Sequence, residues 1–326
     1  MPVFNGERYL KESINSILNQ TYQFFEFIII NDGSTDKTED IILSYSDNRI
    51  KYKKNKENIG VIKTLNIGIK ISSGEFIARM DADDISHKDR LKEQLNFFRL
   101  RKDISVIGIQ FNFINEEGEK IKVSSWPIGL KNIIYTCITG FCPLGHPGVM
   151  MKKYDFELTG NYNKNFEACE DYELWLRYIS KGFKIDNIKK VLLDYRVHEG
   201  QVTSINRKKQ SKNHILAYQN FFNAFSNKKL KSKETINYLN FFNENIDMKS
   251  ENLKVNFFIY MNILKAMKRI HNLEKDIYDD LKNMFFNLVM KKKHNFLSYI
   301  KILFLSKTYN IINIRWFKTF LYAIKK

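Results

Sequence analysis

Cysteine, proline and glycine are scarce in this chain, and it has no uncharged run long enough to span a bilayer. The three cysteines form no CxxC pair, which argues against a disulfide framework and a zinc site and favours a reducing, cytoplasmic setting. Four prolines and 14 glycines leave little material for flexible linkers. The amino terminus runs from Met1 into polar residues without a leader pattern. These absences favour a folded protein inside the cell.

Positive charge is what the chain has in excess, and it is unevenly divided. The formal net charge is +17 over 326 residues, a length that favours about two domains. Residues 1–205 carry 29 Lys and Arg against 28 Asp and Glu, whereas residues 206–326 carry 24 against 8. We therefore expect a neutral domain over residues 1–205, followed by a basic region over residues 206–326.

Hydrophobic periodicity in the neutral domain alternates between two repeats. Apolar stripes of helical spacing predict helices at residues 7–20, 37–45, 59–71 and 88–101, and short apolar runs predict strands at 24–30, 50–53 and 76–80. Strands separated by helices imply crossover connections, hence an α/β fold with a mainly parallel sheet flanked by helices. Ligands of such sheets bind at the carboxyl ends of the strands.

Acidic turns follow two of the predicted strands. Asp32 comes directly after the strand at 24–30, and Asp81, Asp83 and Asp84 come after the strand at 76–80. Clustered carboxylates repel one another unless a cation lies among them, and Mg²⁺ prefers carboxylate and phosphate oxygens. Each turn also has a plainer interpretation, as a helix start or a solvated loop. Asp84 in particular is expected to be a helix-start acid.

Several motifs resemble those of the family-2 glycosyltransferases, which have the GT-A fold. The resemblance covers about the first 205 residues and is carried by the segments 2–6, 16–21, 26–36, 58–60, 81–84, 145–150, 170–177 and 195–198, which include Asn-Asp-Gly-Ser, Asp-Ala-Asp-Asp and Glu-Asp-Tyr-Glu. The family fold implies a Rossmann-like domain. The family activity implies an inverting transfer of a sugar from a nucleotide diphosphate sugar, with a UDP-sugar expected.

The resemblance assigns donor-site roles to five residues. Asp32 would contact the uracil or ribose, with Pro2 and Phe4 beside the base. Asp81 would face the ribose and the sugar. Asp83 would hold Mg²⁺ or Mn²⁺ against the diphosphate. Arg79, which precedes the acidic turn, is expected to balance its charge.

Three further residues receive roles on the opposite side of the site or at the metal. Asp171, with Glu170 beside it, matches the acidic pair that supplies the general base. The plainer interpretation is that both are first-turn acids of a helix, favoured by the helix dipole. His198 would make a further metal or diphosphate contact, and His146 would lie on the acceptor side; each is otherwise a surface or turn histidine.

The expected acceptor is a hydroxyl of a glycan or polyprenyl-lipid-linked glycan in cell-surface polysaccharide synthesis, such as capsule, O-antigen or lipooligosaccharide. Two other functions stay open: a sugar-nucleotide nucleotidyltransferase, and a catalytically inactive, membrane-associated scaffold. The scaffold hypothesis comes from the amino terminus. Relatives carry apolar residues before the segment at 2–3, so we expect the first strand to be truncated at Met1.

Residues 206–326 are expected to form amphipathic helices, because Phe, Tyr and Leu recur at helical spacing between Lys and Asn. Most of these stripes are expected to pack together and onto the first domain. The helix at 311–324 is basic and aromatic, which suits an anionic membrane surface. We therefore expect peripheral binding to the inner face of the cytoplasmic membrane. Without a recognisable binding module, nucleic acid is not expected as a partner.

Overall fold

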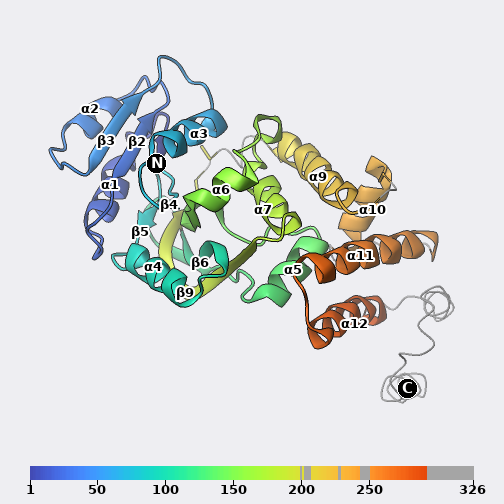
Figure 1. The fold of residues 1–326 in the computed structure, drawn as a ribbon. Helices are drawn as coiled ribbons and strands as arrows, with labels where there is room; N and C mark the ends of the chain where they lie inside the picture. Colours follow the sequence, from blue (N-terminus) through green and yellow to red (C-terminus); the bar gives the residue numbers. More distant parts are fainter. Residues whose placement is uncertain (199, 202–206, 227–228, 243–249, 292–326) are drawn as a thin grey trace.

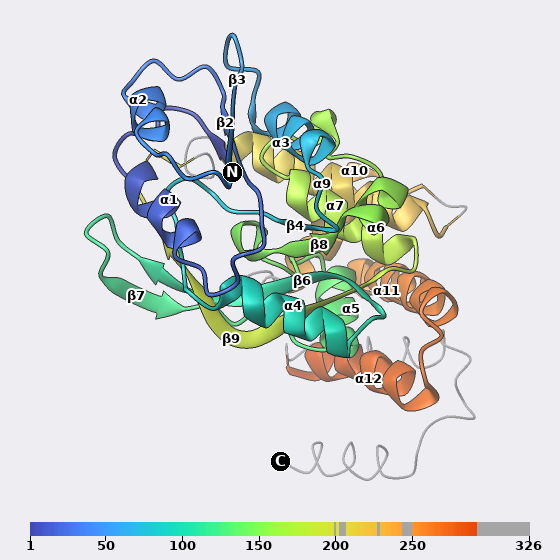
Figure 2. The ribbon, with the colours of Figure 1, turned by 60° about the vertical axis from the view of Figure 1, so that its left-hand side comes forward.

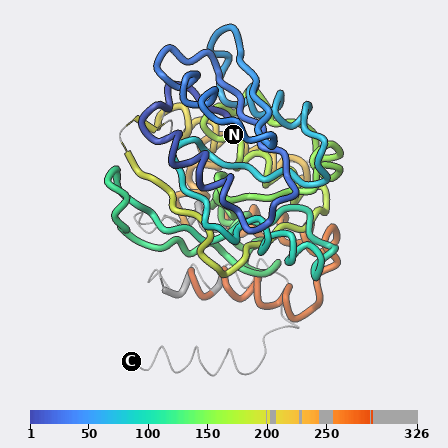
Figure 3. Tube along the Cα trace, turned by 90° about the vertical axis from the view of Figure 1, so that its left-hand side faces the viewer, coloured from blue at the N-terminus to red at the C-terminus, as the bar shows by residue number. Residues whose placement is uncertain are grey.

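The computed structural model describes residues 1–198, 200–201, 207–226, 229–242 and 250–291. Two β-sheets with flanking helices form the first part of the chain, and a group of helices follows (Figure 1). In Figure 3, the first strands and helices, in blue, lie at the top of the molecule, and the last described helices, in orange, lie at the bottom. The expected α/β architecture with a helical carboxyl-terminal region is confirmed.

The first sheet is parallel throughout, with strand order β1-β2-β3. It consists of β1 (Pro2–Val3), β2 (Phe27–Asn31) and β3 (Ile50–Lys54). The helices α1 (Leu10–Leu18), α2 (Thr38–Leu43) and α3 (Val61–Ile71) alternate with these strands, as the periodicity predicts. Because the strands are parallel, Asp32 lies at the carboxyl edge of the sheet. That the first strand is truncated stays a prediction.

The second sheet is mixed, with strand order β4-β8-β6-β9-β5 and β7 paired to β6. Its strands are β4 (Phe76–Ala78), β5 (Ile85–Ser86), β6 (Ile104–Ile114), β7 (Lys120–Val123), β8 (Met150–Lys152) and β9 (Lys184–Arg196). The long strands β6 and β9 are parallel, and the other pairs are antiparallel. Local periodicity could not indicate these antiparallel pairs, since β4 finds its partner more than 70 residues along the chain. Figure 2 shows the β6–β7 hairpin projecting from the sheet.

The remaining helices of this part are α4 (Arg90–Leu100), α5 (Leu130–Ile138), α6 (Lys153–Thr159) and α7 (Glu170–Ser180), with short 3-10 turns at His146–Gly148 and Lys164–Phe166. One face of α7 is fully buried: Leu174, Trp175 and Tyr178. This anchors the helix, whose first turn carries Glu170 and Asp171.

The carboxyl-terminal helices share a hydrophobic core with α5 and α7. They are α9 (Arg207–Asn223), α10 (Ser232–Phe242), α11 (Ser250–Ile270) and α12 (Lys275–Lys291). Tyr238 donates to the Ile138 carbonyl at 2.8 Å, and Tyr218 donates to the same oxygen. The expected packing of the apolar stripes on the first domain is confirmed, whereas the 205/206 boundary stays a prediction. The predicted helix at 311–324 lies outside the described residues.

A cleft of about 730 Å³ lies between the two sheets. It is lined by β2 and β4 and by apolar side chains of α3 and α4, and it reaches Arg79 beside the acidic turn. Among the described helices, none combines the length and hydropathy needed to cross a membrane.

Candidate active site

The acidic turn joins β4 to β5 and brings three carboxylates together. One oxygen each from Asp81, Asp83 and Asp84 lies within 4.8 Å of the others. Asp84 is fully buried, and its Oδ2 has no hydrogen-bond partner in the structure. Burial, followed by the charges of its neighbours, raises the pKa of Asp84 well above its usual range, and burial also raises the pKa of Asp83. Oxygen donors under such mutual repulsion fit a hard divalent cation such as Mg²⁺ or Mn²⁺.

The expected role of Asp84 as a helix-start acid is wrong. Asp84 precedes the strand β5, and the next helix, α4, begins only at Arg90. Its Oδ1 accepts a hydrogen bond from the backbone N–H of Arg196 at 3.0 Å. Asp84 thereby links the turn to the end of β9.

Arg79 compensates part of the charge of the turn, as expected. Its guanidinium forks onto Asp81, with both Nη1–Oδ2 and Nη2–Oδ1 at 2.6 Å, and its side chain is only 7% exposed. The negative charge of Asp81 is therefore already paired with the guanidinium of Arg79. Its predicted contact with ribose or sugar stays a prediction.

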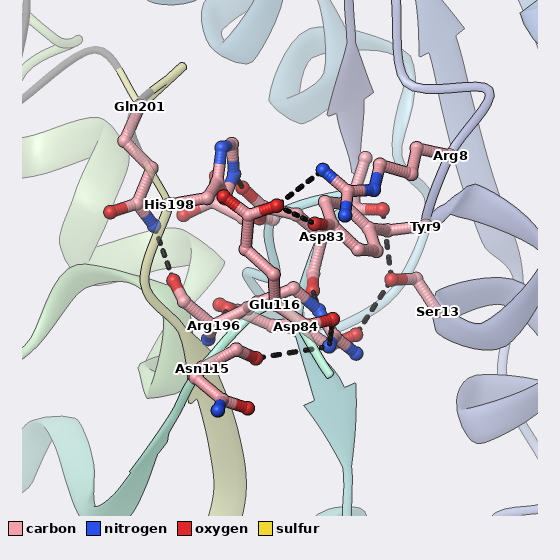
Figure 4. A network of polar contacts seen from close by, with 12 residues as sticks. Arg8, Tyr9, Ser13, Asp83, Asp84, Asn115, Glu116, Arg196, His198 and Gln201 are labelled. Atoms are coloured by element: carbon pink, nitrogen blue, oxygen red, sulfur yellow. Dashed lines mark hydrogen bonds and ion pairs between the residues drawn. The ribbon is translucent and has the colours of Figure 1, made fainter. Parts of the chain in front are cut away.

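His198 lies beside Asp83, the second carboxylate of the turn. Its Nε2 is 3.0 Å from Asp83 Oδ2 (Figure 4). The sequence separates these two residues by 115 positions, and the end of β9 brings them together. An imidazole nitrogen and a carboxylate oxygen that converge in this way fit two ligands of one divalent ion. Metal binding by the pair stays a prediction, and the distance between Nε2 and Oδ2 is compatible with it.

Asp32 lies buried at the end of β2 and holds the loop before α3. Its Oδ1 accepts hydrogen bonds from Asn55 Nδ2 at 2.7 Å and from the Ile59 N–H at 3.1 Å, and its Oδ2 accepts from the Gly60 N–H at 2.9 Å. Oδ2 keeps a second lone pair for a ligand. The contact with base or ribose stays a prediction, and the structure adds a loop-fixing role that the sequence did not indicate.

The residues around Asp32 differ in what they offer a ligand. Phe4 is 47% exposed and Pro2 is half-buried, so an aromatic face is available beside this edge of the sheet. The absence of a side chain at Gly33 makes room for the protein's own backbone, because a Cβ there would lie 2.5 Å from the Glu57 carbonyl carbon.

Glu170 and Asp171 form the acidic pair at the start of α7. Glu170 is 8% exposed, and its Oε2 has no hydrogen-bond partner in the structure. Burial, followed by the charge of Asp171, raises the pKa of Glu170 to about 7. Burial also raises the pKa of half-buried Asp171, although its Oδ1 accepts a hydrogen bond from the Tyr172 N–H at 2.7 Å.

This pair is electrostatically linked to the acidic turn. The charges of Arg79 and Asp81 act on the pKa of Glu170 and on that of Asp171, so the start of α7 faces the β4–β5 turn. A first-turn acid favoured only by the helix dipole would be expected in water, whereas Glu170 is buried. An acidic pair in which one pKa is raised to about 7 fits the source of a general base.

His146 belongs to the wall behind Glu170. Its Nε2 lies 2.9 Å from the Tyr162 hydroxyl, and its Nδ1 lies 3.9 Å from Glu170 Oε1. Burial lowers the pKa of His146 well below its usual range, so the ring is neutral. This geometry makes His146 a neighbour of the acidic pair. Its place on the acceptor side stays a prediction.

Two residues that sequence reasoning passed over hold these groups in place: Tyr162, the partner of His146, and Arg196, whose side chain reaches the acidic turn. The signal for Arg196 is its place in the segment 195–198, one of those that carry the family resemblance. Tyr162 had no comparable signal.

Solved structures share this arrangement of sheets and helices. TarS of S. aureus, residues 1–349 in complex with UDP-GlcNAc, superposes with a TM-score of 0.56 at 20% identity, over 89% of this chain and 86% of that one. The mannosyltransferase PcManGT of Pyrobaculum calidifontis, in complex with GDP-Man and Mn²⁺, superposes with a TM-score of 0.54 at 12% identity, over 95% and 86%. At these identities the likeness defines the class of fold, which is GT-A.

Sequence comparison then gives the family. Residues 1–157 match the model of glycosyl transferase family 2. A glycosyltransferase of Haemophilus influenzae is 34% identical over 218 residues, which cover 64% of this chain and 67% of that protein. The chain belongs to glycosyl transferase family 2 and is a glycosyltransferase. The family expectation from the motifs is confirmed.

Proposed function

We propose that this protein is a metal-dependent, inverting glycosyltransferase that moves a sugar from a UDP-sugar to a hydroxyl of a glycan or lipid-linked glycan in cell-surface polysaccharide synthesis. The observation that carries the proposal is the placement of three converging carboxylates, one of them paired with His198, opposite buried Glu170 and half-buried Asp171. One acidic group suits a metal and diphosphate, and the other suits the removal of a proton.

The donor lies at the carboxyl edge of the first sheet. Asp83 and His198 would hold Mg²⁺ or Mn²⁺, and the ion when bound would supply positive charge where the leaving diphosphate becomes negative. Phe4 and Pro2 flank the base, and Asp32 contacts the base or ribose through the free lone pair of Oδ2. The complexes of TarS with UDP-GlcNAc and of PcManGT with GDP-Man and Mn²⁺ support a nucleotide-sugar donor and a metal.

Asp171 acts as the general base. An acceptor hydroxyl is a weak nucleophile at its own pKa, so a carboxylate within hydrogen-bond reach must accept its proton as the oxygen attacks the anomeric carbon. The attack comes from the face opposite the leaving group and forms one bond as the other breaks. An α-linked donor therefore gives a β-linked product.

The acceptor is presented at the membrane. The 24 basic against 8 acidic residues at 206–326 favour anionic headgroups, at about 1 kcal/mol for each basic side chain that approaches closely. The enzyme thereby works on the inner face of the cytoplasmic membrane. Cosedimentation with anionic vesicles should weaken when residues 290–326 are deleted and in about 0.5 M salt, where charges are screened within a few ångströms. Binding that is unchanged by both refutes membrane docking.

The decisive experiment measures nucleoside diphosphate release from a panel of nucleotide sugars, with and without Mn²⁺, in the wild type and in Asp171→Asn. The wild type should release UDP only with metal, and the variant should be slower by about 10²- to 10⁴-fold. NMR of the product should show inverted configuration. Retained configuration refutes single displacement. Pyrophosphate release from UTP and a sugar phosphate identifies a nucleotidyltransferase instead, and no turnover of any donor identifies a scaffold.

A further inference from the structure

The side chain of Arg196, at the end of β9, is 3% exposed and uses every nitrogen of its guanidinium in hydrogen bonds. Nε donates to the Asp83 carbonyl at 3.0 Å. Nη1 donates to the carbonyls of Asn115 and Glu116, at 3.3 and 3.0 Å, in the β6–β7 hairpin. Nη2 donates to Glu12 Oε2 of α1 at 2.6 Å. One side chain thus ties together three segments that are far apart in the sequence.

One of the segments fixed in this way is the acidic turn, which carries the proposed metal ligand Asp83. The Arg196 guanidinium holds the backbone of Asp83 itself, and the Arg196 N–H holds the carboxylate of Asp84. Two residues beyond Arg196, His198 extends back to Asp83 Oδ2 at 3.0 Å. Figure 4 shows these side chains converging from β9 and from the turn. The relative position of Asp83 and His198 therefore depends on Arg196.

The surroundings of the guanidinium hold it in one orientation. The ring of Tyr9 lies under its plane, with the guanidinium carbon 4.5 Å from the ring centre. Ser13 of α1 donates to the carbonyls of Ala82 and Asp84, at 2.8 and 2.6 Å, and so fixes the turn from its other side. A lysine has one nitrogen and no planar fork, and it could satisfy only part of the acceptors around Arg196.

We propose that Arg196 is a positioning residue that sets the geometry of Asp83 and His198 for the divalent ion; this inference rests on the metal dependence proposed above. Outer partners of metal ligands typically account for about 10- to 100-fold in metal affinity. Arg196 does so by fixing the backbone of Asp83 and, at the end of β9, the start of the segment that carries His198.

The test compares the wild type with Arg196→Lys and, as a matched control, Arg101→Lys. Arg101 is an exposed arginine that pairs with Asp103 at the far end of α4. Mn²⁺ affinity is measured in the presence of UDP by calorimetry and by Mn²⁺ electron paramagnetic resonance. UDP affinity in EDTA and the melting temperature are measured in parallel. We expect Arg196→Lys to weaken Mn²⁺ binding by about 10- to 100-fold, with metal-free UDP affinity within about twofold of the wild type and Arg101→Lys unchanged.

The outcomes separate this inference from the proposed function. A wild type that does not bind Mn²⁺ with UDP contradicts the metal dependence. If the wild type binds Mn²⁺ with UDP and a folded Arg196→Lys binds Mn²⁺ with the same affinity, only the positioning role is contradicted. The positioning role is also contradicted if Arg196→Lys loses as much affinity for metal-free UDP as it loses for Mn²⁺. If Arg196→Lys does not fold, Glu12→Gln is used to test the positioning role. It removes the charge of one partner of Arg196, and because the Glu12 side chain is 54% exposed, this variant should fold. Mn²⁺ binding should then weaken about two- to fivefold, and no change overturns the inference.

Discussion

Replacing Glu170 by Gln should change how the stability of the protein depends on pH. Glu170 is 8% exposed, and among the described residues its Oε2 lacks a hydrogen-bond partner. The basic nitrogen within 4 Å of its carboxylate there is His146 Nδ1, at 3.9 Å, in a ring that burial keeps neutral. Ionising Glu170 therefore places a poorly compensated charge beside Asp171. Gln keeps the shape of the side chain and removes that charge.

The magnitude follows from the pKa shift. Burial and the charge of Asp171 raise the pKa of Glu170 from 4.5 to about 7. At 1.36 kcal/mol per pKa unit, this corresponds to about 3 kcal/mol. Between these two values the folded state binds more protons than the unfolded state, so the wild type loses stability as the pH rises from about 4.5 to about 7. Glu170→Gln lacks this loss, and its advantage should grow over that window and stay constant above it.

Urea unfolding in EDTA, at steps from about pH 5 to about pH 8, measures the difference in free energy of unfolding between wild type and variant. Glu157→Gln on α6 serves as the control, because the Glu157 side chain is 60% exposed. We expect Glu170→Gln to gain up to about 3 kcal/mol over the wild type across this range. A difference that is flat with pH, or that favours the wild type at high pH, refutes the buried-charge argument.

Two further predictions concern the acidic turn and the loop beside Asp32. Asp83→Asn should lower the transfer rate by about 10²-fold or more and remove its dependence on Mn²⁺, while the melting temperature is retained; full activity in a steady-state assay would contradict the assignment. Gly33→Ala should lower the free energy of unfolding by about 2 kcal/mol or more, because a Cβ at φ +74° meets the backbone of Glu57 at 2.5 Å. Gly118→Ala is the control for Gly33→Ala in denaturant titrations, since it has φ +88° but open space around its Cβ; equal losses at the two glycines would show that the contact has no effect.

Local pattern was enough to predict most elements of the first hundred residues. The helices at α1, α3 and α4 and the strands β2 to β4 lie within a few residues of their predicted bounds, because each depends on a periodicity contained in its own segment. The antiparallel pairing of β4 with β8 was not predictable in this way. It depends on which distant strand the edge of β4 meets.

The sequence by itself determined the chemical types at the site: a carboxylate cluster after β4, an acidic pair at the start of α7, and a family resemblance that the comparisons confirm. Only the tertiary structure decided their environment. It brought His198 to Asp83, buried Glu170 deeply enough to raise its pKa to about 7, and placed Arg196 among three segments. Residue type is local information, whereas burial and distance depend on packing between segments up to 184 positions apart, as in the pair of Glu12 and Arg196.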